Sequence, residues 1–412
     1  MKKVAVIGAG PAGMLAAGTL ASRGCDVTLF ERNSLLGKKL GITGKGRCNL
    51  TNDCSPEIFM KNITTNGKFM FSAINRFSPR DTMEFFEKLG VPLKVERGNR
   101  VFPESDKAVD IVLAMKNFLL SSGAKVVHGR VRSLKADGGR IVRIDTEKES
   151  FSYFDDVILC TGGLSYPLTG STGDGFEIAR TLGHTVTPPT PSLVGLESDD
   201  AVCRDAQGLS LKNVGVKVID TEKNKVIYED FGEMLFAHFG VSGPMILSAS
   251  AHMRPMSSGK YKISVDLKPA LTHEKLDARV LADFEKYKNR DLINGLCDLL
   301  PSKLIAPFID KCGISAEKKV NSITKAERAK IVETLKSLTL TVRGFRPIEE
   351  AIVTSGGVKT GEIDPKTMRS KLYGNLYFAG EIIDVDAYTG GFNIQIALST
   401  AMCAADAITS TD

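Results

Sequence analysis

KVAVIGAGPAGMLAAGTLASRGCDVTLFE, residues 3–31, is the segment from which the fold class of this chain is most directly predicted. The apolar, β-branched run KVAVI (3–7) predicts a buried strand, and the segment after it, rich in Ala, Leu and Gly, predicts a closely packed helix. Gly24 ends that helix, and DVTLF (26–30) predicts a second strand. A strand, a helix and a second strand within about 30 residues form a complete βαβ unit.

Three glycines mark the turn between the first strand and the helix. Gly8 allows the tight turn, Gly10 lets backbone N–H groups approach a pyrophosphate, and Gly13 permits close packing of the helix on the strand. The helix N-terminus adds a dipole that favours phosphate charge. Glu31, which ends the second strand, would accept hydrogen bonds from the ribose hydroxyls of adenosine. The pattern predicts an α/β fold with a Rossmann-like dinucleotide-binding domain.

The choice of FAD over NAD(P) depends on segments far from these glycines. FAD is long, so other parts of the chain must hold its isoalloxazine ring. NLYFAGE (375–381) predicts a strand that ends beside an acidic residue, and the segment 390–393 predicts a second helix N-terminus, whose dipole favours the anionic reduced flavin. The turn at 161–163, after the apolar strand FDDVILC (154–160), would be a third contact. We therefore expect FAD as the cofactor.

Changes of composition along the 412 residues indicate several domains, because the chain is too long for one ordinary core. Prolines between 188 and 191 predict a linker or crossover. Short β-like runs follow, and then helical periodicity, with Thr272 and Thr324 as expected N-caps. The expected domains are an FAD-binding domain at 1–190 plus 345–412, a β-rich insert at 191–271 and a helical insert at 272–342.

Charge and composition limit the possible partners. Lys and Arg outnumber Asp and Glu by 54 to 48, with no basic run long enough to indicate nucleic-acid binding. No apolar stretch reaches the length of a membrane span, and the chain opens directly into a strand, without room for a signal peptide. The eight cysteines contain no CxxC pair. We expect a cytoplasmic protein with a small-molecule substrate and with no metal, nucleic acid or membrane as partner.

Seven segments resemble, in order, the BaiN-like family of NAD(P)/FAD-dependent oxidoreductases, which are bacterial flavoproteins. The resemblance covers nearly the whole chain, and GRCN-x-TN (46–52) is particularly specific to that family. The segments are VIGAGPAG (6–13), GKKLGITGKGRCNLTN (37–52), RVFPESDKA (100–108), CTGGLSYPLTGSTGDG (160–175), LFAHFGVSGPMIL (235–247), VTSGGVKTGEIDPKTM (353–368) and LYFAGEIIDVDAYTGGFNIQIAL (376–398).

This resemblance implies an FAD-binding domain of the glutathione-reductase type built from both ends of the chain, with a barrel-like part and a helical part inserted. Family members are associated with reduction of C=C bonds in 3-oxo bile-acid intermediates, and others have been called aminoacetone oxidases. Lys45 departs from the small residue expected in its loop. The implied FAD contacts are Gly8, Ala9, Gly10, Ala12, Gly13, Glu31, Arg32, Lys39, Gly44, Arg47, Cys48, Asn49, Val131, Thr161, Gly162, Gly380, Glu381, Gly391, Asn393 and Ile394.

Reduced flavin can give hydride to the β-carbon of an enone if a donor polarises the carbonyl and an acid protonates the α-carbon. Tyr388, His238 and Tyr166 are the candidate donors, each in a segment of the family type. For Tyr388 the alternative is packing over the flavin, and for His238 it is a hydrogen-bonded core position. Arg343 and Arg346 would bind a substrate carboxylate or form an ion pair.

The leading interpretation is an FAD-dependent reductase of an unsaturated carbonyl compound, with NAD(P)H bound transiently as electron donor. One alternative is an oxidase or dehydrogenase of small amines or alcohols. Another is a flavin-binding, RNA-associated protein, against which the small charge excess argues. Cys48 and Cys54 are separated by five residues, one more than in flavin disulfide reductases, and the chain lacks a second GxGxxG for NAD(P)H, so a redox-active disulfide is not favoured.

Overall fold

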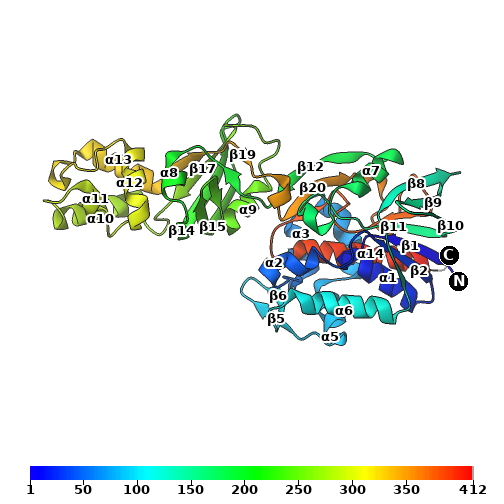
Figure 1. Cartoon of the computed structure of the whole chain (residues 1–412). Helices are drawn as coiled ribbons and strands as arrows, with labels where there is room; N and C mark the ends of the chain where they lie inside the picture. The colour runs from blue at the N-terminus through cyan, green and yellow to red at the C-terminus, as the bar shows by residue number, and fades with distance from the viewer. Residues whose placement is uncertain (411–412) are drawn as a thin grey trace. The chain divides into compact units, whose positions relative to one another are not determined.

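The computed structural model describes residues 1–410, which form two compact units. Unit 1 contains Met1–Ser192 together with the chain from Ile348 onward, and unit 2 is Leu193–Pro347. Figure 1 shows that β1 (Lys3–Ile7), near the N-terminus, and α14 (Phe392–Thr409), the last helix, lie in the same unit. The first boundary lies two residues after the expected position, and the return to unit 1 lies three residues after it.

Unit 1 is built on five parallel strands in the order β21–β11–β1–β2–β7. β1 (Lys3–Ile7) lies at the centre, between β11 (Asp156–Leu159) and β2 (Asp26–Glu31). β21 (Leu376–Phe378) forms one edge and β7 (Lys125–His128) the other. The predicted βαβ unit is confirmed, and the C-terminal part of the chain supplies a strand to the N-terminal sheet.

Three long helices pack together beside this sheet. α1 (Pro11–Ser22) contacts both α14 (Phe392–Thr409) and α6 (Ala108–Ser121), as Figure 1 shows. Gly18 makes the close approach of α6 possible, because a Cβ there would lie 2.4 Å from the ring of Phe118. The remaining helices of unit 1 are α2 (Thr43–Gly46), α3 (Pro56–Lys61), α4 (Phe71–Arg76), α5 (Pro79–Lys88) and α7 (Asp174–Thr181).

The other strands of unit 1 form small antiparallel sheets. The predicted hairpin is confirmed, because Gly138 and Gly139 connect its two long strands, both with positive φ. One sheet contains β8 (Val131–Asp137), β9 (Arg140–Thr146) and β10 (Ser150–Ser152). A second contains β3 (Thr51–Asn52), β5 (Leu93–Glu96) and β6 (Arg100–Pro103). A third contains β4 (Ile63–Thr65) and β22 (Asp386–Ala387).

The proline-rich segment that the sequence predicts as a linker is a strand. β12 (Val186–Ser192) pairs antiparallel with β20 (Val353–Val358), with an irregular register between Thr187 and Thr190. Among the named strands, β12 pairs with β20 alone, so prolines without an N–H group are tolerated on its other edge. The chain therefore leaves unit 1 along β12 and continues into β20 soon after its return.

Unit 2 contains an antiparallel sheet of seven strands, in the order β18–β17–β14–β15–β16–β13–β19. Its edge strands β18 (Leu338–Thr341) and β19 (Gly344–Phe345) are separated by only two residues, which span roughly 11 Å at most. The sheet must therefore curl until its edges approach each other, as in a barrel. The other strands are β13 (Leu196–Glu197), β14 (Ser210–Asp220), β15 (Lys225–Ala237), β16 (Gly240–Ser242) and β17 (Tyr261–Asp266).

The helices of unit 2 share one core with these strands. Leu276 of α10 (His273–Lys286) and Leu335 of α13 (Lys325–Lys336) are fully buried in the same cluster as Ile263 of β17. The structure thus joins residues 272–342 to the strands in one unit, where the sequence predicts a separate helical insert. The expected N-caps are confirmed, because Thr272 and Thr324 each accept a backbone hydrogen bond. The other helices are α8 (Ala201–Asp205), α9 (Pro244–Ser250), α11 (Leu292–Gly295) and α12 (Ser302–Cys312).

A buried histidine links the end of α7 to the segment before β21. The ring of His184 lies 3.0 Å from Glu362 Oε2 through Nδ1 and 3.0 Å from Ser370 Oγ through Nε2. It also packs edge-on against Phe378, with the ring centroids 5.0 Å apart. Burial lowers the pKa of His184, although the Glu362 carboxylate opposes this shift. The folded protein therefore holds the ring in its neutral form.

We expect this histidine to make the stability of unit 1 depend on pH. Its pKa is lower in the folded than in the unfolded state, where it is about 6.5, so the unfolded state takes up the proton first as the pH falls. The stability is therefore present above about pH 6.5 and is lost below it, by at most about 1.4 kcal/mol per pH unit. Thermal unfolding at pH 7.5 and 5.5 should show a smaller pH effect for His184→Gln than for the wild type. An unchanged pH effect would contradict this, and His128→Gln, at an exposed histidine, is the control.

Candidate functional site: a groove at the ends of the parallel strands

A groove of about 330 Å³ lies at the carboxyl ends of the parallel strands of unit 1. Every strand of the sheet contributes to it, because parallel strands end at the same edge. The residues at or just after these ends are Gly8, Glu31, Gly129, Thr161 and Gly380. Segments far apart in the sequence therefore meet around one elongated space.

The turn from β1 to α1 forms the floor of this groove. A Cβ on Gly8 would lie 2.6 Å from the carbonyl oxygen of Cys160, and a Cβ on Gly13 would lie 1.8 Å from that of Gly8. By contrast, a Cβ on Gly10 would meet no protein atom within 4 Å. Gly10 is the N-cap of α1 and, being glycine, has no side chain that could accept a hydrogen bond from the first N–H groups of the helix. Gly8 and Gly13 thus permit tight packing, whereas Gly10 leaves space beside an uncapped helix N-terminus.

The carboxylate of Glu31 is held in a fixed position at the end of β2. It is 8% exposed and accepts hydrogen bonds from the backbone N–H groups of Ala9 (2.7 Å) and Asn33 (2.8 Å). The side-chain amide of Asn33 donates a third bond at 2.8 Å. A carboxylate fixed at this position suits recognition of a ribose hydroxyl pair.

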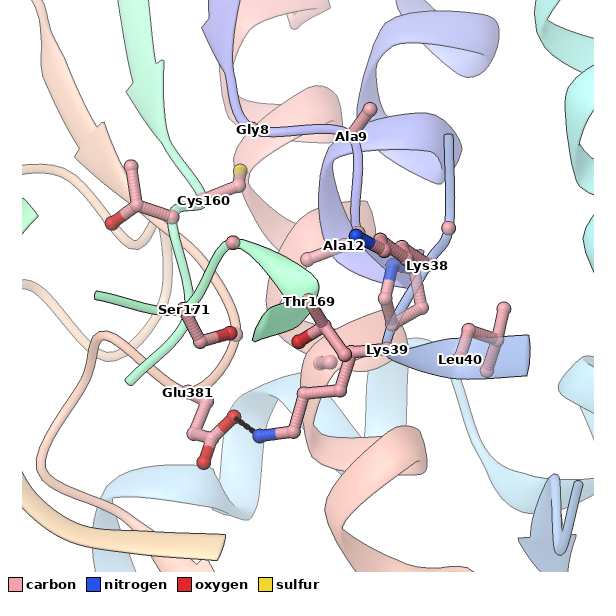
Figure 2. Close-up of a pocket in the computed structure, with 18 of the residues that line it drawn as sticks. Gly8, Ala9, Ala12, Lys38, Lys39, Leu40, Cys160, Thr169, Ser171 and Glu381 are labelled. Carbon is pink, nitrogen blue, oxygen red and sulfur yellow. Dashed lines mark hydrogen bonds and ion pairs between the residues drawn. The ribbon is translucent and has the colours of Figure 1, made fainter. Parts of the chain in front are cut away.

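Two segments bonded to each other form one wall of the groove, which we call the groove wall: residues 33–39 and 169–171. Asn33 Nδ2 donates to Thr169 O (3.0 Å), and Lys38 Nζ donates to Leu168 O (2.7 Å). Figure 2 shows Lys38 and Lys39 facing the loop that carries Thr169. The groove is therefore enclosed on this side by side chains that join two loops.

An ion pair crosses the groove beside this wall. Lys39 Nζ lies 2.7 Å from Glu381 Oε2 and donates to Ser165 Oγ at 2.6 Å (Figure 2). The other carboxylate oxygen of Glu381 accepts the backbone N–H of Thr354 at 2.8 Å. Both charged side chains are 21% exposed, so they remain accessible to a bound molecule.

The second helix N-terminus of the groove belongs to α14. A Cβ on Gly391 would lie 2.3 Å from Thr51 O, so only glycine allows this approach. With its amide oriented to satisfy its neighbours, Asn49 accepts from Gly391 N (3.1 Å) and donates to Thr51 O (3.1 Å). As predicted from the segment 390–393, a helix starts beside the groove, and its dipole stabilises negative charge there.

These features fit a dinucleotide such as FAD. Two helix N-termini, those of α1 and α14, border the same groove, and Glu31 lies at its ribose-binding end. The hydroxyl of Thr161 is buried and has no hydrogen-bond partner within residues 1–410, so it can serve a bound molecule. Gly8, Glu31, Thr161, Glu381 and the α14 terminus would hold the cofactor, which would supply redox chemistry.

All but three of the predicted FAD contacts line the groove. Gly13 lies behind the β1–α1 turn, and Cys48 is fully buried. Arg47 instead pairs with Glu96 and Asp106 and lies 4.2 Å from the ring centroid of Phe102. Contact of the others with FAD stays a prediction. They are Gly8, Ala9, Gly10, Ala12, Glu31, Arg32, Lys39, Gly44, Asn49, Val131, Thr161, Gly162, Gly380, Glu381, Gly391, Asn393 and Ile394.

The three candidate proton donors lie in different parts of the structure. Tyr388 lines the groove, but Tyr166 does not. His238 belongs to unit 2, in the turn between β15 and β16, where its ring packs edge-on against Phe239. It is not among the residues that line the groove of unit 1. Arg343 and Arg346 both form ion pairs with Glu197 in unit 2, at 2.7 and 3.1 Å.

The cysteines show no sign of a redox pair. All eight are free thiols, and burial raises the pKa of Cys48 to about 12 and that of Cys54 to about 11. Neither is therefore a ready thiolate. Within residues 1–410, no three His, Cys, Asp or Glu side chains come together as metal ligands, and no helix has the length and hydropathy needed to cross a membrane.

Sequence reasoning missed several residues of the groove. Lys38, Thr169 and Ser171 lie inside the segments that resemble the family, but they are not among the predicted FAD contacts. Arg130 directly precedes Val131, which is among them. Arg130 and Arg32 share the carboxylate of Asp174 at the Glu31 end of the groove. Ile352 and Val353 also line the groove, and no local pattern marks them.

The parallel sheet and its groove define a Rossmann-type dinucleotide-binding protein. The chain belongs to the HI0933-like family, because the model of the HI0933-like protein Rossmann domain matches residues 2–407. The expected BaiN-like relationship is thereby confirmed, and the protein is an oxidoreductase of an FAD-dependent family.

Curated relatives match over almost their whole length. The chain is 30% identical to the 3-dehydro-bile acid delta(4,6)-reductase of Clostridium scindens, covering 98% of both chains. It is also 30% identical to the ribosomal RNA dihydrouridine synthase of Haemophilus influenzae, covering 97% of this chain and 96% of the relative. The protein of the same name from Escherichia coli is 28% identical, covering 98% and 97%.

Solved structures share the fold at low sequence identity. A 3-ketosteroid-delta4-(5alpha)-dehydrogenase from Rhodococcus jostii, in complex with 4-androstene-3,17-dione, has a TM-score of 0.55 and 13% identity, covering 100% of this chain and 97% of that one. A flavocytochrome c3 fumarate reductase has a TM-score of 0.52 and 15% identity, covering 98% and 78%. These likenesses confirm the fold class.

The groove wall gives a direct prediction about cofactor release. Lys38→Ala removes the bond to Leu168 O, and we expect FAD to dissociate about 2- to 5-fold faster, because one exposed hydrogen bond contributes at most about 1 kcal/mol. The rise of free FAD fluorescence after dilution of the loaded protein measures this rate. Lys116→Ala, at an exposed position on α6, is the control, and equal rates in all three proteins would contradict the prediction.

Proposed function

We propose that this protein reduces a carbon–carbon double bond conjugated to a carbonyl group, with FAD as cofactor and NAD(P)H as electron donor. The observation that carries the proposal is the groove in which Tyr388 lies among residues from α14 and from the ends of the parallel strands. Bound FAD would supply a hydride for the β-carbon of the substrate. The Tyr388 hydroxyl would donate the proton that the α-carbon needs, and solvent would restore it.

Other groups of the groove would orient the cofactor and stabilise its charge. The N-terminus of α14 would stabilise negative charge on the reduced ring, and the N-terminus of α1 would bind the pyrophosphate. Glu31 would bind the adenosine ribose, and Glu381 and Lys39 would contact the linking chain. The eight free thiols agree with a reducing, cytoplasmic location.

The names of the relatives support the same bond type in two kinds of substrate. A delta(4,6)-reductase of a 3-dehydro bile acid removes double bonds conjugated to the 3-carbonyl, and dihydrouridine differs from uridine by two hydrogens across the C5–C6 bond, next to the C4 carbonyl. We favour a small unsaturated carbonyl compound, such as a 3-oxo steroid or bile acid. A uridine of ribosomal RNA is the second candidate, supported by the relatives from Haemophilus influenzae and Escherichia coli.

An anaerobic titration tests the proposal. The purified, FAD-loaded protein is mixed with NADH or NADPH, and bleaching of the visible flavin band shows whether either one reduces it. The reduced protein is then mixed with a 4-en-3-one steroid, or with a transcript of ribosomal RNA. Return of the flavin band with a saturated product identifies the substrate class. Reduction of the flavin by an amine or alcohol, with no reoxidation by any enone, would overturn the proposal in favour of an oxidase or dehydrogenase.

A further inference from the structure

The backbone around Tyr388 is held on one side by a strand. β22 pairs antiparallel with β4, and the N–H of Tyr388 donates to Asn62 O at 3.0 Å. The hydroxyl of Thr64 also donates to Asp386 O at 2.9 Å. These contacts fix the side of the segment 386–388 that faces β4. Within this segment, Tyr388 is the residue that lines the groove.

Beyond its pairing with β4, the same segment is held by two sets of bonds. The carboxylate of Asp386 accepts from Ser192 Oγ (2.7 Å) and Ser355 Oγ (2.8 Å), and the backbone of the next two residues bonds to the side chain of Asn393. Its amide nitrogen donates to the carbonyl oxygens of Ala387 (2.8 Å) and Tyr388 (3.2 Å). Its amide oxygen accepts the N–H of Ala387 at 3.0 Å. Asn393 lies in the first turn of α14, so these bonds connect the helix N-terminus directly to the backbone of Tyr388.

The polar capacity of Asn393 is largely used by these bonds. An Asn amide has two N–H donors, and both are engaged with backbone carbonyls. The opposite orientation of the amide would place its oxygen against two carbonyl oxygens, so the network allows one orientation. The sequence resemblance implies that Asn393 contacts FAD, but in this geometry both N–H donors of its amide are bonded to the backbone.

We propose that Asn393 is a positioning residue, which holds Tyr388 in place at the N-terminus of α14. The inference rests on the proposed function, in which Tyr388 donates a proton to the substrate. Loss of the Asn393 amide removes three bonds to the backbone of Ala387 and Tyr388, while β4 and the bonds of the Asp386 carboxylate still hold the start of the segment. Tyr388 then moves relative to the cofactor, and a displacement of about 1 Å can lower a rate by about 100-fold.

The test compares Asn393→Ala, Tyr388→Phe and the double variant. We expect Asn393→Ala to lower kcat about 10- to 100-fold while KM and the FAD dissociation constant change less than about 3-fold. In the double variant, kcat should equal that of Tyr388→Phe alone, because the amide acts through the hydroxyl. Asn75→Ala is the matched control, since Asn75 also donates to a backbone carbonyl, that of Phe71 (2.8 Å), at an exposed site.

Hydrogen exchange gives a readout that needs no substrate. The amide of Ala387 should exchange faster in Asn393→Ala than in the wild type and in Asn75→Ala, because its acceptor is gone. Unchanged exchange would overturn the inference, as would multiplicative effects in the double variant or an FAD affinity lowered more than 10-fold with kcat preserved at saturating FAD. If Tyr388→Phe alone keeps full activity, the proton-donor role of Tyr388 fails, and the positioning role fails with it.

Discussion

Replacement of Gly13 by alanine is expected to give a protein that no longer retains flavin. The new Cβ would lie 1.8 Å from the carbonyl oxygen of Gly8, where backbone faces backbone and no side chain can move aside. The helix α1 must then shift away from the β1 turn, and this disrupts the groove floor. We expect an FAD affinity at least about 100-fold lower and an unfolding free energy lower by about 1–3 kcal/mol, the usual cost of overpacking.

Alanine substitutions at two other glycines distinguish a loss of FAD binding from a loss of stability. A Cβ on Gly10 meets no protein atom within 4 Å, so Gly10→Ala should keep the wild-type melting temperature but weaken FAD binding, because the methyl group occupies space beside the helix N-terminus. Gly361→Ala should change neither property, since that site is also open and lies outside the groove. Equilibrium titration with FAD measures the affinity for the cofactor, and thermal unfolding measures the melting temperature. Full flavin content in Gly13→Ala would refute the proposed role of this turn.

The second large effect is expected for Tyr388→Phe. This change removes one oxygen from a half-buried ring that lines the groove and leaves the packing of the ring in place. If the hydroxyl donates the proton, kcat for reduction of the enone should fall about 100- to 1,000-fold, the usual contribution of a general acid. Reduction of the flavin by NAD(P)H should keep its rate, because that step does not need the proton donor.

Rapid mixing distinguishes these two half-reactions. The reductive half-reaction is followed by loss of the flavin band, and the oxidative half-reaction by its return after enone is added. Tyr153→Phe is the control, because Tyr153 is 87% exposed and outside the groove. A Tyr388→Phe variant that reoxidises with enone at the wild-type rate would show that the tyrosine only packs against the cofactor.

Local sequence was sufficient for the core of the fold. The run KVAVI and the glycines after it predict a buried strand, a tight turn and a helix, and these are found as β1 and α1. The N-caps Thr272 and Thr324 were predictable for the same reason, since a cap acts within one helical turn. The curled sheet of unit 2 and the core it shares with α10 and α13 follow from contacts between distant segments, which composition does not reveal.

The functional site also combines features that the local sequence predicts with features that depend on contacts between distant segments. Arg47 and Cys48 lie in the motif most specific to the family, yet one pairs with Glu96 and Asp106 and the other is buried behind the groove. Asn393 lines the groove as predicted for a cofactor contact, and the structure adds that its amide bonds to the backbone of Tyr388. Which side of a loop faces a ligand depends on the distant segments that pack against its other side. A local sequence motif does not show which segments these are.

A βαβ unit with a glycine turn suited to a dinucleotide can be predicted from residues 3–31 alone, because apolar periodicity and the conformational freedom of glycine act over a few residues. Which residues line the groove depends instead on long-range packing, because the groove forms where segments distant in the sequence meet. These segments contain Gly8, Glu31, Thr161, Gly380 and the start of α14. The parallel arrangement of the strands brings these positions to one edge, although Gly8 and Phe392 at the start of α14 are 384 positions apart (392 − 8).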